Sequence, residues 1–219
     1  MNILSVPMYL GNIAVCLAVM HGTAYVLRRI EACNEGIEML RANQQCRVIL
    51  CEGMQLCLIV HSVVKGEMSV QSISRTVGLS AFSGCVLAAC IMDITSKRIY
   101  RYVWYMTAFP TALLLRVAYR VPDKERLIEL MLFILLQQLL FSHMYGRADC
   151  HAFCVCAGVI TIQGGGFDGY VMHMALSFII LTIDQIAHKN VTASGKLKKP
   201  VAMVPYIAVG FSLYMMLRK

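Results

Sequence analysis

Two aspartates lie where apolar segments of the chain meet basic residues. Asp93 closes the apolar run CVLAACIM, and Asp149 stands directly before the largely apolar run CHAFCVCAGVI. An ionised carboxylate at the edge of a membrane segment is costly unless it is paired or used. Two carboxyls that converge can share one proton and activate a water molecule for attack on a peptide bond. Asp93 and Asp149 are therefore the candidate catalytic residues.

A purely structural interpretation competes with this one. A carboxylate beside Lys or Arg at a helix end is commonly an interfacial ion pair, and that interpretation is favoured for either aspartate taken alone. Taken together, their placement favours a functional site. The neighbouring cations are expected to shape the local potential or bind lipid phosphate. Glu52 is either a third polar group near the site or a helix-packing residue. The residues expected to shape the site are Glu52, Lys97, Arg98, Gly146, Arg147 and Ala148.

The composition indicates a membrane protein. The chain has 219 residues, of which 58% are hydrophobic and only 15% are charged, and its mean hydropathy is +0.66. Soluble domains are about one quarter charged. The net charge of +8 needs no nucleic-acid partner, because basic loops retained on the cytoplasmic side of a membrane explain it.

The apolar residues occur in blocks about as long as a bilayer is thick. They predict an all-α polytopic bundle that forms one integral membrane domain over 1–219, with two N-terminal helices and a cytoplasmic loop in 1–76 and a six-helix catalytic core in 77–219. Pro110 and Pro205 predict helix kinks, and the glycines 164–166 predict a tight turn. The sixth segment is short and could be tilted, broken or re-entrant. The eight predicted segments are 8–27, 47–64, 77–94, 102–119, 126–144, 150–163, 169–187 and 201–217.

The distribution of Lys and Arg predicts the orientation of these segments. Alternate loops hold twelve basic residues in one set and eight in the other. Because cytoplasmic loops carry the excess of Lys and Arg, the larger set is assigned to the cytoplasm. This assignment places both termini outside and both candidate aspartates together at the cytoplasmic surface. If the last helices were oriented the other way, Asp168 in the GGGFDG stretch would become the rival second aspartate.

At these aspartates the chain resembles the prepilin peptidase family of membrane aspartyl proteases. That family carries one aspartate in a D-x-x-x-x-[KR]-I-P-N motif and the other in G-x-G-D. Here residues 93–101 read DITSKRIYR and residues 146–149 read GRAD. The segment 11–31 is similar to the family's opening helix, 47–52 to a helix start that carries a glutamate, and 199–210 to its proline-and-glycine final helix. The resemblance covers most of the chain with degenerate motifs.

The resemblance implies an aspartic endopeptidase that cuts cytoplasmic leaders from type IV prepilin or pseudopilin precursors. Its expected location is the bacterial inner membrane, and proteolysis needs no cofactor. Larger members also carry a domain with two C-x-x-C pairs and methylate the product with S-adenosylmethionine. This chain has only Cys33 and Cys46 in the corresponding loop, which leaves the methylation open. Tyr100, Arg101 and Ala148 depart from the motifs.

Two other functions fit the same sequence. A small transporter could use paired carboxylates, although its acids would be expected near the bilayer midplane and its halves would repeat. An inactive relative of the peptidase could serve as an assembly factor, given the departures from the motifs.

The Cys150, His151, Cys154 and Cys156 group is better explained by buried thiols than by a metal site, because structural zinc usually takes four ligands with loop-closing spacing.

Overall fold

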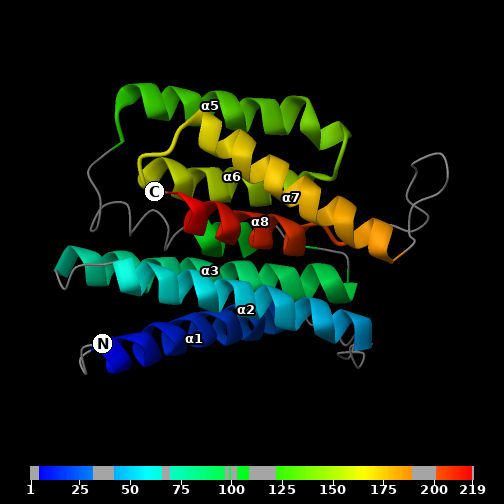
Figure 1. The fold of residues 1–219 in the computed structure, drawn as a ribbon. Helices are drawn as coiled ribbons and strands as arrows, with labels where there is room; N and C mark the ends of the chain where they lie inside the picture. The colour runs from blue at the N-terminus through cyan, green and yellow to red at the C-terminus, as the bar shows by residue number, and fades with distance from the viewer. Residues whose placement is uncertain are drawn as a thin grey trace.

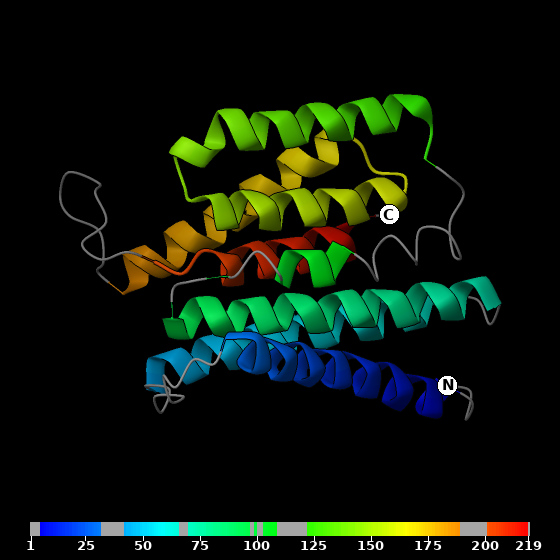
Figure 2. The ribbon, with the colours of Figure 1, turned by 180° about the vertical axis from the view of Figure 1, so that it is seen from behind.

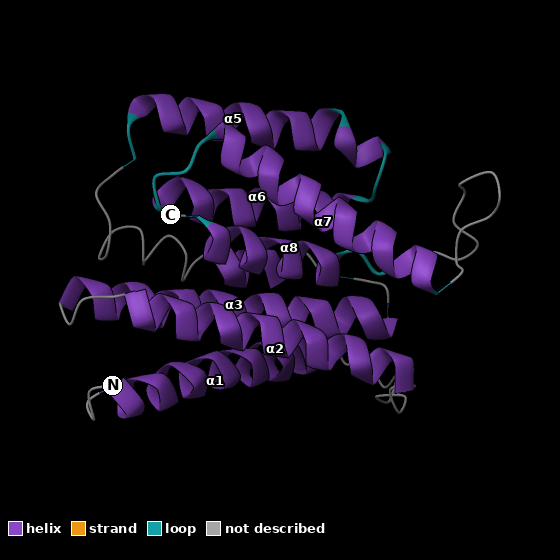
Figure 3. Cartoon of the chain, viewed as in Figure 1, coloured by secondary structure: helices purple, strands orange, loops and turns teal. Residues whose placement is uncertain are grey.

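The computed structural model describes residues 5–31, 42–65, 70–96, 99, 103–108, 122–188 and 201–218, and their regular structure is all helical (Figure 3). The predicted all-α fold is therefore confirmed. Each predicted segment coincides with a helix except 102–119, of which only the helical residues 103–108 are described. Pro110 lies outside the described residues. The helices are α1 (Ser5–Glu31), α2 (Ala42–Lys65), α3 (Val70–Ser96), α5 (Lys124–Leu139), the short 3-10 helix η1 (Phe141–His143), α6 (Arg147–Ile162), α7 (Phe167–Ala187) and α8 (Val204–Leu217).

Helix α8 lies between two groups of helices. On one side are α1, α2 and α3, on the other α5, α6 and α7, and the view from behind agrees (Figures 1 and 2). Helix α8 contacts α2, α3, α6 and α7. The described parts of α1 and α8 nearest the termini lie at one end of the bundle, whereas α3 ends, and α6 and α8 begin, at the opposite end (Figure 1). The C-terminal end of α3 therefore shares one end of the bundle with two helix N-termini.

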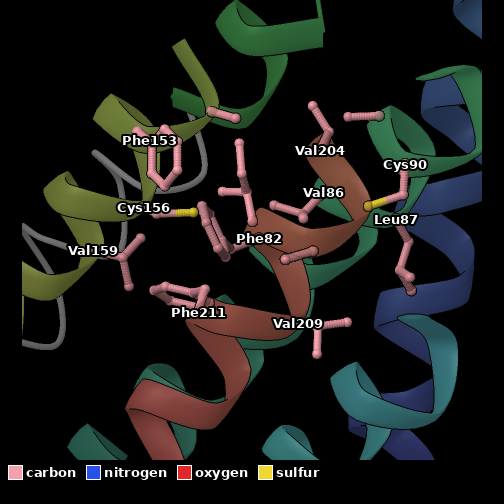
Figure 4. Close-up of a cluster of buried hydrophobic side chains, with 14 of the residues drawn as sticks. Phe82, Val86, Leu87, Cys90, Phe153, Cys156, Val159, Val204, Val209 and Phe211 are labelled. Carbon is pink, nitrogen blue, oxygen red and sulfur yellow. The ribbon is translucent and has the colours of Figure 1, made fainter. Parts of the chain in front are cut away.

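The central position of α8 follows from its composition. Its sequence VPYIAVGFSLYMML is apolar on every side, and a helix of that kind is stable only when it is surrounded. Phe211 of α8 packs against Phe82 of α3 with ring centroids 5.3 Å apart (Figure 4). Gln55 of α2 donates from Nε2 to the Ser212 hydroxyl at 2.8 Å, and His173 of α7 lies 3.0 Å from the Ile207 carbonyl. Polar contacts of this kind tie neighbouring helices together in an apolar interior.

Among the described residues, three helices are long and apolar enough to cross a membrane, namely Ile73–Ile94, Lys124–His143 and Phe167–Ala187. The buried share of the apolar stretch differs sharply among them. It is 78% in the first helix, 11% in the second and 22% in the third. The first is thus an interior helix, and the other two present apolar side chains to the outside. Such large exposed apolar faces are rare on soluble monomers and suit contact with lipid. On α5 the exposed side chains are Leu127, Ile128, Met131, Leu132, Leu135 and Leu139.

One expectation about helix shape needs correction. Pro205 was expected to kink the last helix, but α8 begins only at Val204, so the proline lies in its first turn. There the missing N–H has no intrahelical partner to lose, and no kink is required. The sixth segment forms one unbroken helix, α6. The turn that ends it is confirmed: Gly164 has φ of +79°, and the Gly165 amide bonds to the Ile160 carbonyl at 2.8 Å.

Candidate active site

Asp93 is buried at the end of α3, where it meets the beginning of α8. Only 7% of the residue is exposed. Its Oδ2 accepts a hydrogen bond of 2.9 Å from the backbone amide of Val204, the first residue of α8. The first amides of a helix lack intrahelical partners and carry the positive end of the helix dipole. The Asp93 carboxylate therefore satisfies a free backbone donor and lies in a favourable field for negative charge.

Asp149 lies in the first turn of α6. The helix starts after Gly146, and the aspartate is its third residue, half-buried. An acidic side chain at this position also interacts favourably with the helix dipole. A Cβ placed on Gly146 would lie 3.3 Å from the Asp149 Oδ2, so the carboxyl turns back toward the helix start. The small residue before the helix leaves the carboxyl room in this position.

The two carboxyls act on each other across the bundle. Burial raises the pKa of Asp149, and the charge of Asp93 raises it further, to about 7. An isolated carboxyl of this type titrates near pH 4. Asp93 lies in the last turn of α3 and Asp149 in the first turn of α6, at the same end of the bundle (Figure 1). A carboxylate held by a helix N-terminus therefore shares this end with a carboxyl that is largely protonated just below neutrality.

The structure separates the other predicted site residues. Gly146 and Ala148 adjoin Asp149, whereas Arg147 is exposed and its carbonyl lies against the His151 ring. Glu52 is half-buried in α2, and its charge acts on the Cys16 thiol of α1. The side chains of Lys97 and Arg98 lie outside the described residues.

The rival aspartate, Asp168, lies at the other end of α8. It is exposed in the first turn of α7, next to Gly169, whose added Cβ would meet the Tyr214 hydroxyl. Tyr214 belongs to the last turn of α8, and Val204, which binds Asp93, is its first residue. Ten residues of helix correspond to about 15 Å. Asp168 is therefore remote from Asp93, and the alternative pair is ruled out by the packing of α7 on α8.

A polar cluster at the same end as Asp93 was not predicted. The Tyr206 hydroxyl donates to Asp184 Oδ2 at 2.5 Å, and Gln185 Nε2 donates to the same oxygen at 2.8 Å. Gln185 also donates to the Tyr206 oxygen at 3.1 Å. We call these three residues the Asp184 cluster. The sequence shows an acid inside an apolar segment, but its partner lies on another helix 22 residues away, and no local pattern links them.

In the parts of the chain that the structure describes, no three His, Cys, Asp or Glu side chains form a group that could hold a metal ion. Cys150 and Cys156 are buried free thiols of α6, and Cys154 is partly buried. Asp93 and Asp149 are thus the acidic groups that the described site offers for chemistry.

Comparison with known proteins leaves the chain without a match. No protein-family model, no curated protein and no solved structure matches this sequence or fold.

Proposed function

We propose that this chain is a membrane aspartyl endopeptidase of the prepilin peptidase type, which removes the cytoplasmic leader from type IV prepilin-like precursors. One observation carries the proposal. Asp93 and Asp149 come from different helices, lie at one end of the bundle and interact electrostatically. Two carboxyls held in unlike environments, one favouring the charged form and one the neutral form, are what acid–base hydrolysis of a peptide bond requires.

The reaction follows from these two environments. The ionised carboxyl takes a proton from a water molecule, whose oxygen attacks the carbonyl carbon of the scissile peptide bond. The protonated carboxyl then gives its proton to the leaving nitrogen as the carbon–nitrogen bond breaks. The products are a free carboxyl on the leader and a free amino group on the mature chain, and the pair ends with one proton, as it began.

The site's surroundings agree with a cytoplasmic leader as substrate. In the sequence, the set of alternate loops that follows Asp93 and precedes Asp149 holds twelve of the twenty Lys and Arg residues, and the positive-inside rule assigns that set to the cytoplasm. The apolar faces of α5 and α7 provide the contact with lipid that a multi-pass protein of the bacterial inner membrane needs. Substrates of this class present their leaders at that membrane surface.

Co-expression with a prepilin-like precursor tests the proposal. In a host that lacks its own leader peptidase, the mass of the precursor should fall by the mass of the leader. The Asp93→Asn, Asp149→Asn double variant is the control and should leave the precursor intact. An intact precursor beside folded wild-type protein would refute the proposal. Proton flux that depends on the aspartates would identify a transporter, and pilus assembly that the double variant supports equally well would identify an assembly factor.

The pH dependence of cleavage gives a second expectation. The pKa of Asp149 is raised to about 7, so the pair holds its proton below this pH and loses it above. Because the reaction needs one protonated carboxyl, the rate should fall about tenfold per pH unit above pH 7. Initial rates of cleavage in lipid nanodiscs between pH 5 and 9 measure this limb. A rate that stays constant up to pH 9 would contradict the role of Asp149 as the acid.

A further inference from the structure

The first turn of α8 is held from two sides by carboxylates of other helices. Asp93 of α3 binds the Val204 amide, and Asp184 of α7 binds the Tyr206 hydroxyl. The amide that binds Asp93 and the side chain that binds Asp184 belong to residues 204 and 206 of the same turn. Tyr206 and Gln185 are both buried, with exposed fractions of 6% and 2%. The turn that presents its amide to Asp93 is thus anchored on α7 by a closed set of hydrogen bonds.

We propose that the Asp184 cluster is a positioning device, which holds the first turn of α8 so that its amide stays on Asp93. The proposal rests on the proposed protease function, since it gives the cluster a role in maintaining the charged member of the catalytic pair. Asp184, Gln185 and Tyr206 touch neither water nor substrate in this scheme. They act on the chemistry only through the position of the Val204 amide.

The other ties between α7 and α8 lie farther along the helix. His173 contacts the Ile207 carbonyl, and Gly210 packs tightly against Ser177. Both of these ties fix the helix beyond its first turn. Pro205 has no amide hydrogen, and the first backbone bonds of the helix run from residues 206 and 207 to Met203. In the first turn itself, Cys51 of α2 contacts the Pro205 carbonyl at 3.7 Å, and the Tyr206 hydroxyl provides the tie to α7.

Two titratable groups lie at the same end of the described structure as Asp93. Asp149 faces it from α6, and Cys90 precedes it by one turn of α3. The hydrogen bond from the Val204 amide favours the charged form of Asp93.

His188 lies beside the Asp184 cluster. Its Nδ1 is 3.3 Å from Asp184 Oδ1 and 2.9 Å from the Asp184 carbonyl oxygen, and the histidine is exposed. This contact does not involve the Tyr206 hydroxyl. A variant at Tyr206 therefore changes the anchor of α8 without changing the charges at Asp184 and His188.

The test uses Tyr206→Phe with Tyr214→Phe as the matched control. Both changes remove one hydroxyl from a tyrosine of α8, at opposite ends of the helix. Infrared difference spectra of the whole protein in nanodiscs record the band of a protonated carboxyl that Asp93→Asn removes. In Tyr206→Phe this band should appear about one pH unit higher than in the wild type, because a hydrogen bond to a charged carboxylate is weakened. Cleavage should also slow at low pH as Asp93 becomes protonated, and in Tyr206→Phe the midpoint of this decline should rise by the same amount. Tyr214→Phe should shift neither the infrared band nor this midpoint.

The infrared measurement needs no substrate, so it separates the two proposals. If the wild type cleaves no precursor, the protease function fails, while the shift of the Asp93 band still decides the role of the cluster. An Asp93 band that is unchanged in folded Tyr206→Phe overturns the positioning role. Equal shifts in Tyr206→Phe and Tyr214→Phe also overturn it, because they would reflect general loosening of α8.

Discussion

Asparagine at either Asp93 or Asp149 should lower the rate of leader cleavage by about 10²–10⁴-fold, the range contributed by a positioned acid or base. Asparagine has nearly the same shape as aspartate, and its carbonyl oxygen can still accept the hydrogen bond that Val204 donates to Asp93. The loss is therefore expected in folded protein. Because the two groups share one proton, each single variant should be about as defective as the double variant.

The matched control for this prediction is Asp168→Asn. Asp168 is exposed in the first turn of α7, at the opposite end of α8 from Asp93. Cleavage by this variant should equal that of the wild type, since its carboxyl is remote from the pair. Initial rates on a purified precursor, with thermal midpoints to verify folding, provide the measurement. A single variant that keeps more than about one tenth of the wild-type rate would contradict the shared role of the pair.

Alanine at Gly210 should separate α7 from α8 and destabilise the protein by about 1–3 kcal/mol. A Cβ on Gly210 would lie 2.3 Å from the Ser177 hydroxyl oxygen, 2.8 Å from its backbone nitrogen and 3.0 Å from its Cα. The side chain of Ser177 could rotate, but its backbone belongs to α7 and cannot move without the helix. The contact between His173 and the Ile207 carbonyl would be strained by the same displacement.

Gly158→Ala provides the comparison for Gly210→Ala. This glycine lies within α6, and a Cβ there would meet nothing within 4 Å. The substitution should be neutral or stabilising by up to about 1 kcal/mol, because alanine favours helix more than glycine does. Unfolding of both variants in sodium dodecyl sulfate measures the difference. Equal stability of the two variants would show that the close approach of α7 and α8 is unnecessary.

The helical segments and the two aspartates could be predicted from the sequence, for reasons that are local. Segment length follows from runs of apolar residues, and Asp93 and Asp149 stand out because each lies where such a run meets charge. Their placement at one end follows from counting segments between them. These features need only the order of residues along the chain.

Contacts between helices could not be predicted in the same way. The rotation of α8 about its axis decides that Tyr206 meets Asp184 and that the Val204 amide meets Asp93. The rotation of α2 likewise places Glu52 near Cys16. A helix that is apolar on all sides has no pattern from which its rotation can be read. The kink expected at Pro205 was wrong for a related reason. The apolar segment begins at residue 201, but the helix begins only at Val204, and the sequence alone does not show that the proline lies in its first turn.

Peptide groups at two helix starts contribute to the positive field at the aspartate pair, and this has a consequence for how the chain can vary. Asp149 lies at the start of α6, and Asp93 meets the start of α8. Every residue except proline contributes the same backbone amide, whatever its side chain. Substitutions around the two aspartates can therefore accumulate while the donors stay in place, provided that both helices still begin at the same residues. Ala148, which replaces the second glycine of the G-x-G-D motif, is such a change, because its amide occupies the same place in the first turn of α6.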